Sequence, residues 1–226
     1  MEVVKILIKY FPSLIIALTE TVKLSVLSLV FALILGIFFG LFRITKNRVL
    51  RVIASTYIEI IRGTPLMVQT FIIYYGLAQV LKPTGFSWAE IGGAFTAGTV
   101  TLSLNAGAFM AEIIRGGIEA VDIGQMEAAR SLGLSYIQAL RKVILPQAFR
   151  IILPSIINQC IISLKDTSIL SVIGIRELTM SGKILAGNST SLVMAVWIVI
   201  AIFYFVVCFA LSLGAKYLEG RLKYGK

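Results

Sequence analysis

The 226-residue sequence contains no histidine and only two cysteines, Cys160 and Cys208. Histidine is the commonest metal ligand in proteins and the usual side-chain switch near neutral pH, so its absence argues against both kinds of site. The two cysteines lie in separate apolar segments, which indicates neither a disulfide framework nor a metal centre. We therefore expect this chain to hold no metal and no disulfide.

Charge is also scarce, since 14% of the residues are charged while 58% are hydrophobic, and the mean hydropathy is +0.94. A helix needs about 20 apolar residues to cross a hydrocarbon core of about 30 Å. Five segments are long and apolar enough, which predicts an all-α integral membrane protein with five transmembrane helices in a single domain, 1–226. The predicted spans are 20–42, 64–81, 93–114, 146–166 and 192–216.

The first twelve residues show no recognisable secretion signal. They mix Glu2, Lys5 and Lys9 with apolar residues, and no small-residue cleavage site follows a short apolar core. We expect this segment to be retained as an interfacial helix ahead of the first span.

The basic excess gives a formal net charge of +10, which we interpret as membrane topology rather than nucleic-acid binding. Lys and Arg gather in the cytoplasmic connections of membrane proteins. With five spans, 14 of the 21 basic residues fall on the side of the C-terminus, in the connections 42–63 and 115–150 and in the tail. The sequence therefore predicts an N-terminus outside and a cytoplasmic C-terminus.

The connection between the third and fourth spans carries signals for two short helices at 122–146. Glu127 is expected in the first turn of one helix, where a carboxylate suits the helix dipole, and Gly133 at a left-handed C-terminal cap. Ser135 can cap a second helix, which is expected to end at a Leu145-Pro146 break. On these signals alone, an amphipathic helix lying on the inner leaflet is an equal alternative. The surface expected to allow close approach comprises Ala128, Ala129 and Leu132.

This connection resembles the EAA loop of membrane subunits of ATP-binding-cassette (ABC) importers. The family pattern is Glu-Ala-Ala, three residues, Gly, nine residues, an apolar residue, any residue, then Leu-Pro. The one departure is Val143, where the family usually has isoleucine, and that exchange is tolerated in volume. The matching positions are Glu127, Ala128, Ala129, Gly133, Val143, Leu145 and Pro146.

Four further stretches resemble one branch of that family, the polar-amino-acid permeases of the histidine/glutamine type. With the loop, they cover a permease core of about residues 17–218, and five matches in order are more specific than one. The resemblance implies five spans and an N-terminus outside, as the charge distribution also predicts. The stretches are 57–66, 102–108, 112–118 and 163–168.

The resemblance implies that the 122–146 loop is a coupling helix that docks in a cleft of a cytoplasmic ATPase, where Glu127 meets a basic group. This chain has no Gly-x-x-x-x-Gly-Lys-Ser/Thr phosphate loop; the nearest dipeptide is Gly182-Lys183. ATP and Mg are therefore expected on the separate ATPase, and no catalytic residue or cofactor on this chain. The expected partners are an ATPase dimer, a second permease chain, identical or homologous, an extracytoplasmic substrate-binding protein and membrane lipid, in a prokaryotic cell (inner) membrane.

Polar residues within the spans are candidates for substrate contact, because such groups are costly in lipid unless they face protein or water. Asn105 lies near the middle of the third span, on one helical face with Thr101, Ala108 and Glu112. Pro154 is expected to free carbonyl groups in the fourth span. An amino-acid zwitterion needs donors for its carboxylate and acceptors for its ammonium. The candidate substrate residues are Asn105, Asn158, Lys165, Asp166, Thr167 and Ser168.

Each of these sites also has a purely structural interpretation. The two asparagines could bond across helices, and Lys165 with Asp166 could form an ion pair at the water interface. Glu112 and Arg115 are candidates for an inner gate, although a local salt bridge is favoured.

Two glycine-containing patterns are interpreted structurally. Gly63-Thr64-Pro65 predicts a chain break that starts the second span. Gly36 and Gly40 form a GxxxG pair, which indicates close helix packing.

The predicted function is the permease subunit of a type I ABC importer for polar amino acids, basic ones included, acting as a dimer. The alternative is an ion-driven secondary carrier that uses Asp166 or Glu112 as its coupling carboxylate. Such carriers usually contain internal repeats, and no clear repeat is present here. A membrane scaffold without transport activity is a third interpretation.

Overall fold

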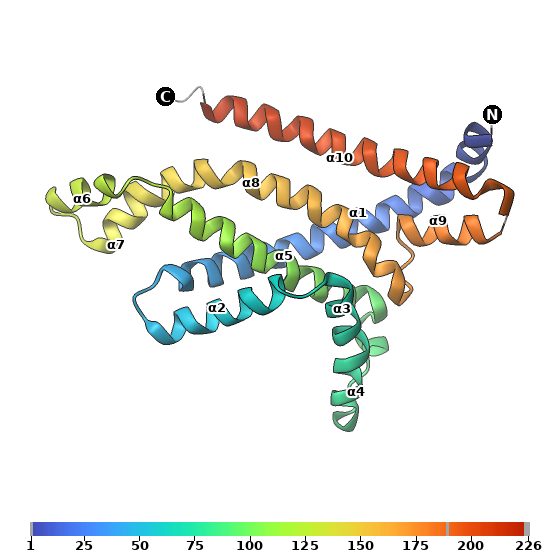
Figure 1. Ribbon diagram of the computed structural model, residues 1–226, viewed down its shortest axis with the longest axis horizontal. Coiled ribbons are helices and arrows are strands. Elements are labelled where there is room, and N and C mark those ends of the chain that lie inside the picture. Colours follow the sequence, from blue (N-terminus) through green and yellow to red (C-terminus); the bar gives the residue numbers. More distant parts are fainter. Residues whose placement is uncertain (1, 189, 224–226) are drawn as a thin grey trace.

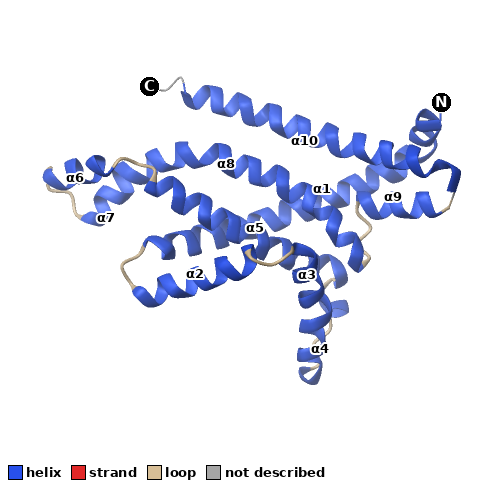
Figure 2. Ribbon diagram, viewed as in Figure 1, coloured by secondary structure: helices blue, strands red, loops and turns tan. Residues whose placement is uncertain are grey.

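The computed structural model describes residues 2–188 and 190–223, which are helical along most of their length (Figures 1 and 2). Four helical stretches are long and apolar enough to cross a membrane: Glu2–Ile44, Gly93–Glu119, Tyr136–Ile173 and Val193–Tyr217. A bent pair, Arg48–Arg62 with Leu66–Thr84, can form a fifth span. The predicted all-α membrane fold is therefore confirmed, and the second predicted span is the bent one.

The helices fall into long helices, shorter α-helices and short 3-10 or π segments. The long helices are α1 (Glu2–Ile44), α5 (Gly93–Glu119), α8 (Leu145–Asp166) and α10 (Val193–Lys223). The remaining α-helices are α2 (Arg48–Arg62), α3 (Leu66–Phe71), α4 (Leu77–Leu81), α6 (Ile123–Ser131), α7 (Tyr136–Ala139) and α9 (Leu178–Gly187). Short 3-10 or π segments are η1 (Ile72–Gly76), η2 (Lys82–Thr84), η3 (Trp88–Ile91), η4 (Leu140–Ile144), η5 (Thr167–Ile173) and η6 (Thr190–Leu192).

Helix α1 contains 43 residues, a length of about 65 Å, and is longer than the first predicted span. The prediction of a separate interfacial helix over residues 1–12 is wrong, because α1 continues through Pro12. Ile6 and Leu14, on either side of the proline, are both buried in one apolar cluster with side chains of α9 and α10. This shared packing holds the two sides of Pro12 in one helix.

Helices α1 and α5 pack closely at two glycines. A Cβ atom at Gly36 would lie 2.6 Å from the Cβ of Met110, and one at Gly40 would lie 3.0 Å from the carbonyl oxygen of Ala111. The distance at Gly36 leaves no room for a side chain, and the one at Gly40 makes a tight contact. The interpretation of the GxxxG pair as a packing motif is therefore confirmed.

The chain turns sharply between α2 and α3. The two helices of the bent pair differ in direction by 106° at Gly63-Thr64-Pro65, so α3 and α4 point away from the main bundle (Figure 1). The Thr64 hydroxyl donates to the Ile60 carbonyl, and Pro65 begins α3 with φ of −65°. The predicted chain break is confirmed, although the sequence did not predict the direction of the segment that follows.

The predicted helix end at Leu145-Pro146 is wrong. α7, η4 and α8 form one continuous helical run, and α8 also continues through Pro154. The Leu145 N–H donates to the carbonyl of Leu140 across the π turn η4. A π turn locally widens the helix, which eases the clash between the Pro146 ring and the preceding turn.

Candidate functional site

The 122–146 loop lies at the end of the bundle where α1 and α5 end and α8 begins (Figure 1). The Asp122 side chain caps α6 by accepting a hydrogen bond of 2.6 Å from the Gly124 N–H. Gly133 has a φ of 86° and donates to the Arg130 carbonyl at 3.0 Å, while Leu134 donates to the Ala129 carbonyl at 3.2 Å. This pair of bonds is the usual ending of a helix at a left-handed glycine. The predicted C-terminal cap at Gly133 is confirmed.

A reciprocal capping box starts α7. The Ser135 hydroxyl accepts from the Gln138 N–H at 3.3 Å, and the Gln138 side chain accepts from the Ser135 N–H at 2.9 Å. The predicted cap at Ser135 is therefore confirmed. The placement of Glu127 in a first turn is wrong, because Asp122 starts α6 early and puts Glu127 in the middle of the helix, where it is exposed.

Large apolar side chains are exposed on this loop. The exposed fraction is 75% for Ile123, 85% for Leu132 and 73% for Ile137. Ala128 is also exposed, whereas Ala129 is buried, so only part of the predicted close-approach surface is free. Gathered apolar exposure of this kind marks a contact with protein or membrane.

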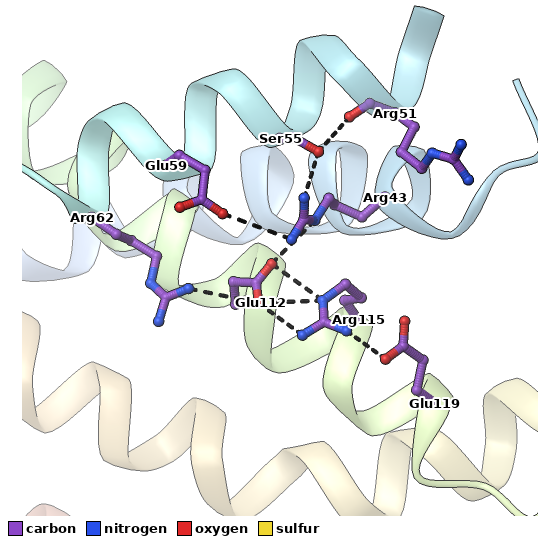
Figure 3. Close-up of polar contacts among 8 residues, drawn as sticks. All are labelled: Arg43, Arg51, Ser55, Glu59, Arg62, Glu112, Arg115 and Glu119. Carbon is purple, nitrogen blue, oxygen red and sulfur yellow. Dashed lines mark hydrogen bonds and ion pairs between the residues drawn. The ribbon is translucent and has the colours of Figure 1, made fainter. Parts of the chain in front are cut away.

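Three guanidinium groups converge on the Glu112 carboxylate near the C-terminal end of α5 (Figure 3). Arg115 approaches it to 2.9 Å from the next turn, Arg43 to 3.3 Å from α1, and Arg62 to 3.6 Å from the end of α2. The Glu112 side chain is only 16% exposed. Coulomb attraction is stronger in such a partly dehydrated position, so one carboxylate joins three helices.

Two further carboxylates bring this cluster close to neutrality. Glu119 pairs with Arg115, and Glu59 of α2 lies 4.0 Å from Arg43. Arg43 also donates to the Ser55 hydroxyl. The local Glu112–Arg115 ion pair is thus present inside a larger cluster, while the gate role of this pair stays a prediction.

Asn105 is buried, and its side-chain amide donates to the side-chain oxygen Oε1 of Gln69 at 2.9 Å. The Gln69 amide in turn donates to the Ile61 carbonyl at 2.7 Å and to the Thr64 carbonyl at 3.0 Å. A chain break leaves carbonyl groups at a helix end without partners, and Gln69 satisfies them here. This contact matches the structural interpretation of Asn105, a bond between helices.

The other candidate substrate residues lie in or just after α8. Asn158 and Lys165 are exposed, and Asp166 is half-buried at the last position of that helix. The Thr167 hydroxyl donates to the Leu164 carbonyl at 2.7 Å, whereas Ser168 is half-buried. The hydrogen bond of Asn105 leads to Gln69 rather than to this group. The predicted substrate site stays a prediction.

Sequence reasoning did not single out several polar residues that contact Glu112 and Asn105. Arg43 and Arg62 were counted only as basic residues of a connection, and Gln69 was not considered. One signal was present, because Arg62 precedes the Gly63-Thr64-Pro65 break and so had to lie at a helix end. Its partner Glu112 is fifty residues away in sequence, and no local pattern indicates that contact.

Comparisons with known proteins agree along most of the chain. "Probable glutamine ABC transporter permease protein GlnM" of Bacillus subtilis is 40% identical over 205 residues, 90% of each chain. "Glutamine transport system permease protein GlnP" of Escherichia coli K12 is 41% identical over 213 residues, 94% of each chain. A solved structure of an amino acid ABC transporter with histidines matches with a TM-score of 0.86 and 41% identity, covering 95% of this chain and 96% of that one.

A MetNI methionine ABC transporter in an inward-facing conformation shares the fold, with a TM-score of 0.74 at 20% identity over 92% of this chain and 97% of that one. The family model described as "binding-protein-dependent transport system inner membrane component" matches residues 32–224. This chain belongs to that family of membrane permeases.

Proposed function

We propose that this chain is the membrane-spanning permease subunit of an ATP-driven importer for polar amino acids. The main observation behind this proposal is that two glutamine permeases are 40% and 41% identical to this chain over nearly its full length. Related permeases are named for cystine and for arginine, the latter 38% identical over 216 residues. These names support a polar amino acid as the substrate class, basic ones included. They favour an ABC importer over the ion-driven carrier considered from the sequence.

A separate ATPase docks on the 122–146 loop. This loop is part of a permease core that comprises residues 17–218. The exposed apolar side chains of Ile123, Leu132 and Ile137 support this proposal, because they are available for burial by a partner. Gly133 turns the chain back toward α7. The proposed coupling residues are Glu127, Ala128, Ala129, Leu132, Gly133, Leu145 and Pro146.

The loop and the C-terminal end of α10 lie at one end of the bundle, and the start of α1 at the other (Figure 1). This arrangement supports a cytoplasmic C-terminus and an outer N-terminus in a prokaryotic cell membrane. Two such chains, identical or homologous, form the path. Closure of an ATP-loaded ATPase dimer moves the two loops together and turns the path outward, where a binding protein delivers the amino acid. ATP and Mg belong to the ATPase.

Within the membrane, we retain Asn158, Lys165, Asp166, Thr167 and Ser168 as candidate substrate contacts. Asp166 offers a half-buried carboxylate for an ammonium group, and Lys165 an exposed cation for a carboxylate. Asn105 is a weaker candidate, because its amide already bonds to Gln69.

The test is reconstitution. The tagged chain is purified with the partners it retains, placed in proteoliposomes with ATP inside, and supplied with radiolabelled glutamine or arginine and the binding protein outside. We expect uptake that requires ATP and a phosphate-loop ATPase, which co-purifies with wild type and is lost with Gly133→Arg. Uptake by the purified chain alone, driven by an ion gradient, would instead support a secondary carrier.

A further inference from the structure

Among the residues that the structure describes, Glu59 and Arg62 each make one ion pair within the charge cluster, and both pairs are long. Arg62 reaches Glu112 at 3.6 Å with 42% of its side chain exposed, and Glu59 lies 4.0 Å from Arg43 with 73% of its side chain exposed. Both distances are long for charged partners, whose bonds are usually near 2.8 Å. Glu59 and Arg62 therefore retain much of their capacity to bind another charged group.

Arg62 can leave Glu112 without leaving that carboxylate unpaired. Arg43 remains 3.3 Å from Glu112, and Arg115 donates from both its Nε and its terminal nitrogen. Removing one cation from three is therefore much less costly than removing the only partner of a buried charge. The cluster can exchange the Arg62 contact for a ligand.

Helix α2 has an exposed apolar face with a polar face beside it, and it packs on the bundle through Ala54 and Ile58. Its apolar residues Val49, Val52, Ile53 and Ile60 are exposed. Ser55, Glu59 and Arg62 follow one another at four and three residues and so lie on one face, toward the cluster (Figure 3). A helix with an exposed apolar face and partly exposed charges beside it suits a position between lipid and a watery path. The charges of Glu59 and Arg62 would then border that path.

Glu59 and Arg62 lie one helical turn apart, with about 5–6 Å expected between their Cβ atoms. They present a carboxylate and a guanidinium side by side. An α-amino acid carries the complementary pair, an ammonium and a carboxylate on one carbon. Guanidinium binds carboxylate through two parallel hydrogen bonds, and Phe109 lies 5.5 Å from the Arg62 guanidinium carbon, where its ring can support the plane of that group.

We propose that Glu59 and Arg62 form an exit site for the α-ammonium and α-carboxylate of the transported amino acid. The proposal rests on the proposed function, since it takes an amino acid as the cargo. The site recognises the groups that all α-amino acids share and not the side chain. Binding there is weak, because both residues are exposed and the amino acid must displace existing ion pairs. Weak binding suits release into the cytoplasm.

The test measures glutamine binding to the purified permease–ATPase complex, without binding protein, by saturation-transfer NMR, which detects weak ligands. The variants are Arg62→Gln, Glu59→Gln and the charge-conserving Arg62→Lys. Arg51→Gln is the matched control, because Arg51 is exposed on the same helix and lies outside the site. Two analogues probe the wild type: 4-aminobutanamide lacks the α-carboxylate, and glutaramic acid lacks the α-ammonium. ATP-driven uptake by wild type is measured in parallel.

The proposal expects glutamine binding to weaken about tenfold or more in Arg62→Gln and Glu59→Gln, to recover in Arg62→Lys, and to stay within about twofold in Arg51→Gln. In wild type, both analogues bind more weakly than glutamine, and this comparison does not depend on how a variant folds. Unchanged binding in both glutamine variants, with wild-type uptake intact, overturns the exit site alone. Absence of ATP-driven amino-acid uptake by wild type overturns the proposed function itself.

Discussion

The 122–146 loop and the charge cluster around Glu112 lie at the same end of the molecule and are built in opposite ways. The loop is shaped by bonds between near neighbours, such as Asp122 with Gly124 and Ser135 with Gln138. The cluster joins residues from three helices, with Arg43 and Glu112 almost seventy positions apart. A pocket of about 470 Å³ is lined by both regions, through Arg43 and Glu119 on one side and Asp122 and Tyr136 on the other.

The two regions also differ in what they leave unsatisfied. The loop exposes apolar side chains that gain by burial against a partner. The cluster pairs its opposite charges within the chain, closely around Glu112 and Arg115 and at longer distances for Glu59 and Arg62. The loop is therefore suited to bind another protein, and the cluster to hold α1, α2 and α5 in a fixed arrangement. Variants that affect one property and spare the other test this difference.

The largest effect is expected from Gly133→Arg, which should abolish uptake and leave membrane insertion intact. A residue with a side chain is strained at the φ of 86°, and the added bulk projects where the ATPase would dock. Uptake in proteoliposomes and retention of the ATPase on purification measure the effect. Gly133→Asn is the control, since asparagine tolerates the left-handed conformation, and it should retain most of the uptake. Normal uptake by Gly133→Arg would exclude the coupling role.

Glu112→Gln should lower the free energy of unfolding by about 2–4 kcal/mol, because three guanidinium groups lose their shared carboxylate. The protein is heated in detergent, and size-exclusion chromatography measures the fraction that stays folded at each temperature. The change appears as a lower Tm. Glu119→Gln is the matched control: its side chain is 55% exposed, so its loss should cost less than about 1 kcal/mol. Equal changes in the two variants would show that the cluster does not hold the helices together.

Gln69→Leu should lower the free energy of unfolding by about 1–3 kcal/mol, since it leaves the Asn105 amide and two carbonyl groups at the α2–α3 turn without partners. The same thermal measurement applies. Gln79→Leu serves as the control, because Gln79 is exposed on α4 and should change stability by about 0.5 kcal/mol or less.

Leu132→Ala should have the smallest effect on stability, within about 0.5 kcal/mol, since the side chain is 85% exposed. The affinity of this permease variant for the ATPase should nevertheless fall roughly tenfold, because an apolar contact is lost at the docking surface. Titration of the purified ATPase onto the permease in nanodiscs measures that affinity. An unchanged affinity would remove Leu132 from the docking surface.

The sequence predicted features that depend on near neighbours. Hydropathy located the long spans, and turn chemistry located the caps at Gly133 and Ser135, because each signal lies within a few residues of the structure it produces. Features set by packing were missed. The apolar cluster with α9 and α10 extends α1 back past Pro12, and the π turn η4 carries the helix through Pro146.

The candidate site divides along the same line. The caps of the loop were predicted from its own residues, whereas the position of Glu127 and the helix end at Leu145-Pro146 were wrong. The local ion pair of Glu112 with Arg115 was predicted as well, but the partners of Glu112 and Asn105 on other helices were not, because Arg43, Arg62 and Gln69 reach them from distant segments. Ionic and amide contacts between distant segments depend on how helices cross, which no short pattern records.

The uninterrupted helical run from Tyr136 to Ile173 links the loop mechanically to the far half of the membrane domain. Its 38 residues correspond to about 57 Å, so it can act as a lever. If this lever pivots near Tyr136, a tilt of about 5° displaces the end at Ile173 by about 5 Å, which is roughly the pitch of one helical turn. Asp166 and Ser168 lie toward the Ile173 end, where a small rotation at the proposed ATPase dock would become a movement as large as an amino-acid side chain.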